Sequence, residues 1–222
     1  MTQADGMDVP YIIRQEKEED FYEVEALLKR AFWNLYVPGC EEHYLAHTMR
    51  SHPDFIKELS LVIEAQPAGI VGTVMYAVSQ LTDEAGVKKD ILTFGPVAVE
   101  PAYQRKRYGK ALLERSFEIA GELGYDVIVI FGNPGNYVGR GFKSCMKYNV
   151  CLEGDVYPAA MLVKELKEGA LGGKKWFYKG SSAYEINKEG FDGFDRTHEK
   201  MIPGYQPSQE EFFIHSHANL KQ

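Results

Sequence analysis

Residues 90–131 read DILTFGPVAVEPAYQRKRYGKALLERSFEIAGELGYDVIVIF, and this segment indicates the fold class. Asp90–Glu100 predicts a strand that Gly95-Pro96 interrupts, because proline has no N–H for the ladder. Gly109–Leu123 has apolar residues every three or four positions, which predicts an amphipathic helix. The all-apolar Val127–Phe131 predicts a buried strand. Strand, helix and strand in this order predict a βαβ crossover with parallel strands.

The flanking sequence predicts more elements of the same sheet. Before the crossover we expect a strand over Tyr11–Arg14 and two helices over Phe21–Ala31 and Glu41–Arg50. A hairpin of Leu61–Ala65 with Ile70–Val78 is expected next. After the crossover we expect a turn or short helix over Asn136–Arg140. Further strands are expected within Phe142–Leu152 and over Met161–Leu166. Residues 1–168 are therefore predicted to form an α/β (α+β) domain, in which helices flank a mixed central sheet.

Residues 169–222 form a predicted C-terminal extension. The segment GALGGKK is typical of a linker, but the rest is too rich in aromatic residues for a disordered tail. We expect it to be ordered by packing on the core or in a homodimer interface. Ser208 followed by Glu211 resembles a capping box and predicts a last helix over Gln209–Leu220.

Composition excludes several classes of protein. A formal net charge of −7 argues against nucleic acid or an anionic membrane as partner, because both attract Lys and Arg. The sequence has no run of about 20 apolar residues and no secretory signal at its start, so a cytoplasmic protein is expected. Cys40, Cys145 and Cys151 lack metal-ligand spacing. His43 and His47 stand one helical turn apart but lack further ligands, so no metal is predicted.

A local basic cluster stands out in this acidic chain. It precedes the predicted helix in the segment QRKRYGK, whose residues are Gln104, Arg105, Lys106, Arg107, Tyr108, Gly109 and Lys110. The first backbone N–H groups of a helix have no intrahelical partner, and the helix dipole places partial positive charge there. Such a site binds phosphate or diphosphate. The alternative is a solvated basic loop that only opens the helix.

The segment FGPVAVEPAYQRKRYGKALL resembles the coenzyme A motif of the GNAT N-acetyltransferase superfamily, in which a strand leads through Gln/Arg-x-x-Gly-x-Gly/Ala into a helix. With GNPGNYVGRGF downstream, it is similar to the YhbS-like subset of predicted acetyltransferases. The similarity covers roughly Tyr11–Leu166 and excludes the extension. It implies the GNAT fold and transfer of an acetyl group from acetyl-CoA to a primary amine of a small molecule or peptide.

The resemblance also implies roles for individual residues. Acetyl-CoA would lie between the two crossover strands, with its pantetheine arm paired to the backbone of Val97, Ala98 and Val99. Tyr137 would be the general acid that protonates the departing thiolate, unless it only packs under Gly141 and Phe142. Asn133 would hold the pantetheine or the substrate, although Asn-Pro-Gly is equally expected as a turn.

Two features depart from the family pattern. The glutamate that serves as base in histone-type relatives has no counterpart, so Glu100 is the nearest acidic candidate, with a water chain as the alternative. Arg107 replaces the first motif glycine, a position that an arginine can occupy if its φ stays negative. Both departures leave open a non-catalytic module that binds coenzyme A or protein partners. The aromatic residues Phe32, Trp33 and Tyr36 favour an apolar or cationic acceptor, or else belong to the core.

Overall fold

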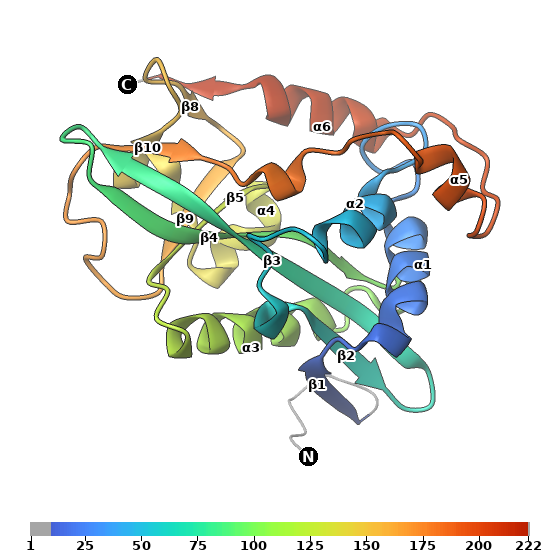
Figure 1. Cartoon of the computed structure of the whole chain (residues 1–222). Coiled ribbons are helices and arrows are strands. Elements are labelled where there is room, and N and C mark those ends of the chain that lie inside the picture. Colours follow the sequence, from blue (N-terminus) through green and yellow to red (C-terminus); the bar gives the residue numbers. More distant parts are fainter. Residues whose placement is uncertain (1–9, 222) are drawn as a thin grey trace.

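The computed structural model describes residues 10–221, and a mixed sheet with helices on both faces is its main feature (Figure 1). The helices are α1 (Phe21–Phe32), α2 (Glu42–Met49), α3 (Tyr108–Glu122), α4 (Pro134–Tyr137), α5 (Phe191–Asp195) and α6 (Pro207–His217). The strands are β1 (Tyr11–Gln15), β2 (Leu61–Ala65), β3 (Gly69–Asp83), β4 (Lys88–Val99), β5 (Val127–Phe131), β6 (Lys143–Ser144), β7 (Val150–Cys151), β8 (Tyr157–Pro158), β9 (Met161–Glu165), β10 (Trp176–Lys179) and β11 (Asn219–Leu220).

The sheet has nine strands, and its main path runs β1-β2-β3-β4-β5-β9-β6. Neighbours on this path are antiparallel except β4 and β5, which are parallel and joined by α3. The predicted βαβ crossover and the predicted hairpin of β2 and β3 are therefore confirmed. β3 continues to Asp83, five residues beyond the predicted end at Val78, because its second half pairs with both β4 and β10.

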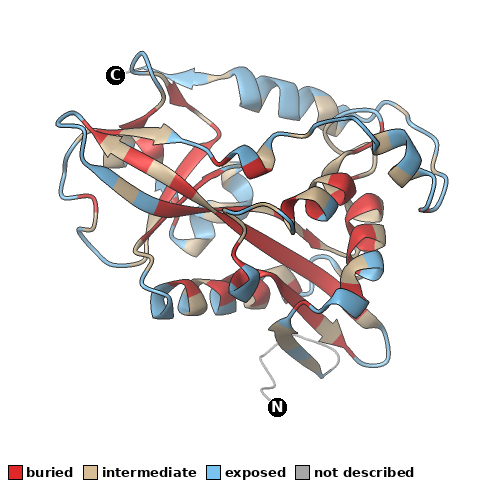
Figure 2. Ribbon diagram, viewed as in Figure 1, coloured by how far each residue is buried: buried red, intermediate tan, exposed pale blue. Residues whose placement is uncertain are grey.

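The two faces of the sheet pack against different helices. Along β3, Val74 and Tyr76 point into the cluster under α3, while Met75 and Ala77 point into the cluster under α1 and α2. A strand covered on both faces needs no polar alternation, and most residues in the middle of β3, β4 and β5 are buried (Figure 2).

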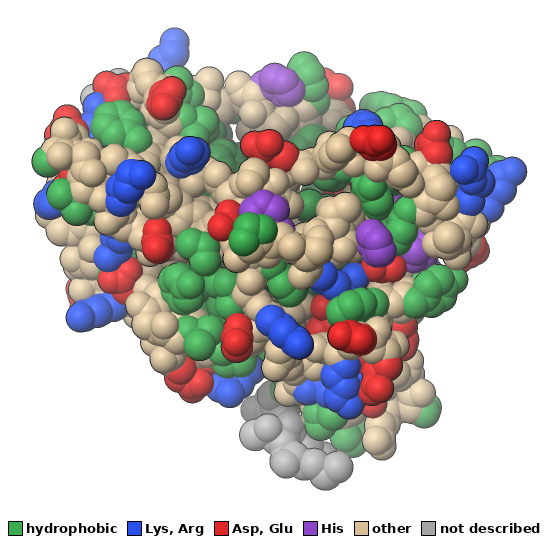
Figure 3. Space-filling view, in the orientation of Figure 1, with side chains coloured by type: hydrophobic (Ala, Val, Ile, Leu, Met, Phe, Trp, Pro, Cys, Tyr) green, Lys and Arg blue, Asp and Glu red, His purple; other side chains and the backbone are tan. Residues whose placement is uncertain are grey.

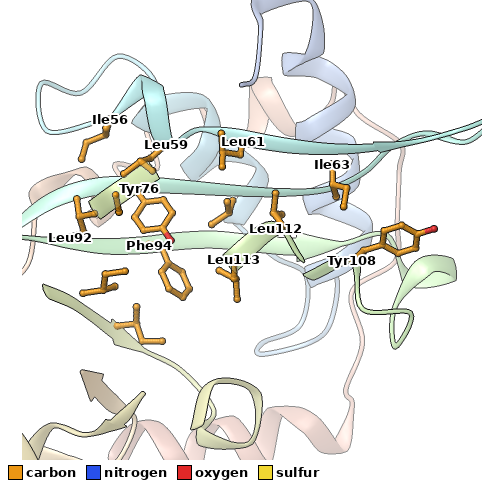
Figure 4. Close-up of a cluster of buried hydrophobic side chains, with 14 of the residues drawn as sticks. Ile56, Leu59, Leu61, Ile63, Tyr76, Leu92, Phe94, Tyr108, Leu112 and Leu113 are labelled. Atoms are coloured by element: carbon orange, nitrogen blue, oxygen red, sulfur yellow. The ribbon is translucent and has the colours of Figure 1, made fainter. Parts of the chain in front are cut away.

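Packing on the core beneath α3 determines where this helix begins and how it lies on the sheet. Leu112 of α3 is fully buried and contributes about 2 kcal/mol of hydrophobic stabilisation. In Figure 4, Tyr76 and Phe94 lie together between the strands and α3, with ring centroids 5.3 Å apart. The hydroxyl groups of Tyr76 and Ser116 are hydrogen-bonded at 2.6 Å. Tyr108, which is 1% exposed, anchors the first turn of α3 to this core.

The sheet is irregular at Gly95-Pro96, as the sequence predicts. The pairing of β3 with β4 shifts register there, because Tyr76 faces Phe94 whereas Val74 faces Val97. β5 pairs with β4 at the single register position Leu92↔Ile128. The edge of β4 that follows is therefore not covered by β5, and the two parallel strands splay apart toward their carboxyl ends.

The sheet extends past the predicted domain boundary at residue 168. β10 pairs antiparallel with β3 and parallel with β7, so residues of the extension complete the sheet. Asp195 of α5 contacts Lys29 Nζ at 2.6 Å and His43 Nε2 at 2.9 Å. Lys29 is only 2% exposed, and a buried ammonium group needs such a partner. The extension thus packs on the core here.

Helix α6 runs along one edge of the molecule and is mostly exposed (Figures 1 and 2). It begins at Pro207, after the N-cap residue Gln206, so the predicted start at Gln209 with Ser208 as capping residue is wrong. Proline suits the first position of a helix because its missing N–H is not needed there.

One substitution tests the packing of β3. We expect Gly72→Ala to lower the free energy of unfolding by about 2 kcal/mol, because overpacking a core costs about 1–3 kcal/mol. An added Cβ would lie 2.9 Å from both the Ala98 carbonyl oxygen and Ile63 Cγ2. Gly121→Ala in α3 is the control, since nothing lies within 4 Å of its added Cβ. Urea unfolding of both variants measures the difference, and equal stability would contradict this packing.

Candidate active site

A cavity of about 480 Å³ lies where β4 ends, α3 begins and α4 faces them. The two parallel strands diverge at this point, so the cavity follows from the splay of the sheet. It is lined by Ala31, Phe32, Leu35, Tyr36, Val97, Ala98, Val99, Tyr103, Gln104, Arg105, Arg107, Tyr108, Gly109, Lys110, Leu113, Gly135, Asn136, Tyr137 and Arg140. We refer to it as the first cavity. It brings together most of the residues that the sequence predicts for coenzyme A.

The first turn of α3 forms one end of the first cavity. Arg107 is the N-cap with φ of 67°, and Arg105 also has a positive φ, 63°. The condition of a negative φ at Arg107 is therefore not met, because this arginine adopts a left-handed conformation. The Gln104 side-chain amide donates to the carbonyl oxygen of Val99 at 3.1 Å, which ties this loop to the end of β4.

Positive charge gathers around this helix start. Arg105, Arg107, Lys110 and Arg140 line the first cavity, and no Asp or Glu among residues 10–221 does so. Gly109 packs closely on the end of β4, because an added Cβ would lie 3.3 Å from Val99 Cγ2 and would require Val99 to shift. Lys106 is not part of the lining, and its ammonium group lies 5.3 Å from the ring centroid of Tyr103. Cations around helix N–H groups make a site for a diphosphate.

Tyr137, the last residue of α4, lies in the wall of the first cavity. Its ring stacks over Gly132, where an added Cβ would lie 2.6 Å from Tyr137 Cε2. It also contacts Phe94 and Phe142, with ring centroids 5.6 and 5.9 Å apart. Burial raises the pKa of the Tyr137 hydroxyl above its ordinary value, so the neutral, proton-donating form prevails. Tyr137 therefore packs on Phe142 and also lines the first cavity.

Glu100 follows β4 but does not line the first cavity. Arg30 of α1 holds its carboxylate through Nε and Nη2, with the shortest contact 2.8 Å. The hydrogen bond to Glu100 raises the pKa of Arg30. Glu100 thus links α1 to the end of β4.

Asn133 lies at the start of α4 and caps it, because its side-chain oxygen accepts from the Gly135 N–H at 2.9 Å. It lines a second cavity of about 590 Å³ beside the first. This second cavity is enclosed by Leu35, Tyr36, Phe131, Gly132, Asn133, Asn136, Leu152, Val156, Pro158, Ala160, Ser208, Glu211, Phe212, His215, Ser216, His217 and Asn219. Leu35, Tyr36 and Asn136 belong to both cavities, so the two share a wall.

Sequence reasoning missed several of these residues. Arg140 is three residues after Tyr137 in the segment already singled out, and its charge was the available signal. The contribution of α6 had no clear signal, because its side chains reach the site only through the tertiary fold. Trp33 belongs to the core under α1, and its indole N–H donates to the carbonyl oxygen of Ile202 at 3.0 Å.

Other kinds of site find no support in the part of the chain that the structure describes. Residues 10–221 contain no cluster of three or more His, Cys, Asp or Glu side chains placed to hold a metal ion. Within the same residues, no helix combines the length and apolar character needed to cross a bilayer.

A model of the acetyltransferase (GNAT) family matches residues 29–142, which include β4, α3, β5 and Tyr137. The chain therefore belongs to this family, and the predictions of the GNAT family, of the GNAT fold and of an acetyltransferase are confirmed.

Individual relatives agree with this assignment. The uncharacterised N-acetyltransferase YhbS of Escherichia coli is 25% identical over 162 residues, which cover 73% of this chain and 91% of YhbS. The crystal structure of that protein in complex with CoA superimposes with a TM-score of 0.69 at 21% identity, covering 83% of this chain and 97% of the other. A GNAT acetyltransferase from Brucella melitensis in complex with acetyl-CoA gives a TM-score of 0.59 at 20% identity, covering 79% and 98%. These two structures share the fold.

Proposed function

We propose that this protein transfers the acetyl group of acetyl-CoA to a primary amine by direct attack, with Tyr137 as general acid. The observation that carries the proposal is the first cavity, in which cations and the first turn of α3 meet the uncovered edge of β4. The CoA and acetyl-CoA complexes of its structural relatives support the choice of ligand.

The first cavity offers a place for each part of acetyl-CoA. The diphosphate binds the backbone amides at Gly109 and Lys110, and Arg105, Arg107 and Arg140 supply charge around it. The pantetheine arm extends along Val97–Val99, where the backbone pairs with β3 on one side only. An extended ligand added to such an edge gains main-chain hydrogen bonds. The thioester then lies near Tyr137, between the diphosphate site and the wall that the two cavities share.

The reaction needs three proton transfers. The ammonium group of the acceptor must lose a proton before its nitrogen attacks the thioester carbon, because a primary amine is mostly protonated at neutral pH. A C–N bond then forms, the C–S bond breaks, and the thiolate of CoA takes a proton from the Tyr137 hydroxyl. The raised pKa of Tyr137 keeps that proton in place until the thiolate departs. The second proton of the attacking nitrogen passes through water to the Tyr137 oxygen, which restores the hydroxyl and leaves a neutral amide.

The group that accepts the proton from the amine is less well defined than the general acid. Glu100 remains a candidate because it follows β4 directly, but its carboxylate is bound to Arg30 and lies outside the lining of the first cavity. These contacts favour a water molecule beside the amine as the first proton acceptor.

A non-catalytic module that binds coenzyme A is the alternative, motivated by the absence of a motif base. The release of free thiol from acetyl-CoA in the presence of a panel of primary amines separates the two. The proposal expects amine-dependent thiol release. Binding of acetyl-CoA without any amine-dependent release would favour the module.

Two further proposals concern the setting of the reaction. We propose that the protein acts in the cytoplasm, as its composition suggests, and that it forms a homodimer through exposed apolar side chains of the extension. Ile202, Tyr205 and Phe213 are 84%, 72% and 56% exposed, and a second copy of the chain would cover these apolar side chains in the proposed dimer. A sedimentation measurement that gives only monomer would contradict the dimer.

A further inference from the structure

The C-terminal extension forms one side of the second cavity. Ser208, Glu211, Phe212, His215, Ser216 and Asn219 line it with the spacing of one helical face, from α6 and the residues after it, and His217 lines it as well. This spacing places their side chains on one face of the segment. Yet the described part of α6 contains no buried residue. This face therefore borders a cavity instead of packing into the core.

The two cavities differ in charge. Of the residues that the structure describes, the first is lined by Arg105, Arg107, Lys110 and Arg140 and by no acidic residue. Of the same residues, the second is lined by Glu211 and by no Lys or Arg. Within residues 10–221, the Glu211 carboxylate has neither an ion pair nor a hydrogen bond, so its charge is available to a ligand. An anionic carrier suits the first cavity and a cationic ligand suits the second.

The rest of the second cavity is mainly apolar. Phe131 and Phe212 line it and are still 50% and 40% exposed. A ligand with an apolar group would cover part of this surface and gain the corresponding hydrophobic free energy. Along α6, at the top of the view, Figure 3 shows hydrophobic, histidine and acidic side chains next to one another.

The beginning of α6 lies near the wall shared by the two cavities. The ring centroids of Phe212 and Tyr36 are 4.6 Å apart, and the Gln209 side-chain amide donates to the Asn34 carbonyl oxygen at 3.0 Å. Glu211 is therefore at the end of the second cavity that faces the first. Leu152 and Val156 lie beside β8, which pairs with β11 directly after α6, so they add apolar lining near the C-terminal end of this helix.

We propose that the second cavity is the acceptor site and that the acceptor is a small primary amine carrying an aromatic or branched apolar group. This inference rests on the proposed acetyl transfer. Glu211 binds the ammonium group near the shared wall, and the apolar group lies among Phe131, Phe212 and the apolar lining from Leu152 and Val156. After losing its proton, the amine nitrogen reaches the thioester from the side opposite the diphosphate.

Initial rates of thiol release test this site in the full chain with acetyl-CoA. We compare 2-phenylethylamine with ethanolamine, which keeps the primary amine but lacks the ring, and expect kcat/KM at least about tenfold higher for the former. Glu211→Gln should raise KM for 2-phenylethylamine about tenfold, with kcat and the KM for acetyl-CoA nearly unchanged, because a charge-assisted hydrogen bond is lost. Glu210→Gln is the matched control, since Glu210 is exposed on α6 and outside the cavity.

Three outcomes overturn the inference. Equal KM values for the Glu211→Gln and Glu210→Gln variants would remove Glu211 from the site. A preference for ethanolamine would contradict the apolar acceptor. In both cases acetyl transfer itself would stand. Absence of thiol release with every amine, despite binding of acetyl-CoA, would overturn the proposed function and the acceptor site with it.

Discussion

Replacing Tyr137 with phenylalanine lowers kcat for acetyl transfer about 100-fold and leaves the affinity for acetyl-CoA within about threefold. General acid catalysis contributes about 10²–10⁴-fold to a rate, so loss of the proton donor takes effect at the chemical step. The ring itself stays, and its contacts with Phe94 and Phe142 preserve the wall of the first cavity. Binding therefore changes little while the thiolate leaves without its proton.

Steady-state thiol release and a separate titration with acetyl-CoA measure the two effects. Tyr76→Phe is the control, because it removes a buried hydroxyl that is bonded to Ser116 and lies outside the first cavity. It should keep kcat within about twofold. A Tyr137→Phe variant with unchanged kcat would assign the proton to another donor.

The pH dependence gives a second test of the same residue. Burial raises the pKa of Tyr137 above its ordinary value, so the hydroxyl remains protonated as pH rises to about 9. We expect kcat to show no decline from tyrosine ionisation up to that pH. A decline below pH 9 that disappears in Tyr137→Phe would show that the hydroxyl loses its proton too early for this role.

The double substitution Arg105→Glu with Lys110→Glu weakens acetyl-CoA binding by about 100-fold or more. Both residues line the first cavity at the start of α3, and the change places two acidic groups where the diphosphate binds. Juxtaposing like charges costs several kcal/mol, and about 2.7 kcal/mol corresponds to 100-fold in affinity. Glutamate near a helix N-terminus is favourable to the helix, so α3 should remain folded.

A matched double variant controls for net charge. Arg115→Glu with Lys143→Glu makes the same change of charge at two exposed positions that do not line the first cavity. Calorimetric titration should give this control nearly the affinity of the unaltered protein. An equal loss of acetyl-CoA affinity in both double variants would mean that the overall electrostatic field of the protein, and not the start of α3, attracts the ligand.

The crossover and most of the first cavity were predictable from sequence because local signals encode them. Leu112, Leu113 and Phe117 repeat at helical spacing, and the basic loop stands directly before that helix. Tyr137 was found through a motif whose residues are adjacent along the chain. These features need no knowledge of distant contacts.

Other features depend on tertiary structure. The left-handed φ of Arg107 could not be predicted from sequence, because an arginine gives no local signal for that conformation. The pairing of β10 with β3 joins residues about a hundred positions apart along the chain. The face of α6 that borders the second cavity was missed because the helix has no marked apolar stripe.

The comparison of acetyl-CoA with acetyl-pantetheine, which has the same thioester but no diphosphate, tests whether the start of α3 holds the diphosphate. Both ligands are titrated into the same full-length protein by calorimetry. We expect acetyl-CoA to bind at least about 100-fold more tightly, and its advantage to shrink in the Arg105→Glu, Lys110→Glu variant. Equal affinities for the two ligands would contradict the assignment of the first cavity as the coenzyme A site.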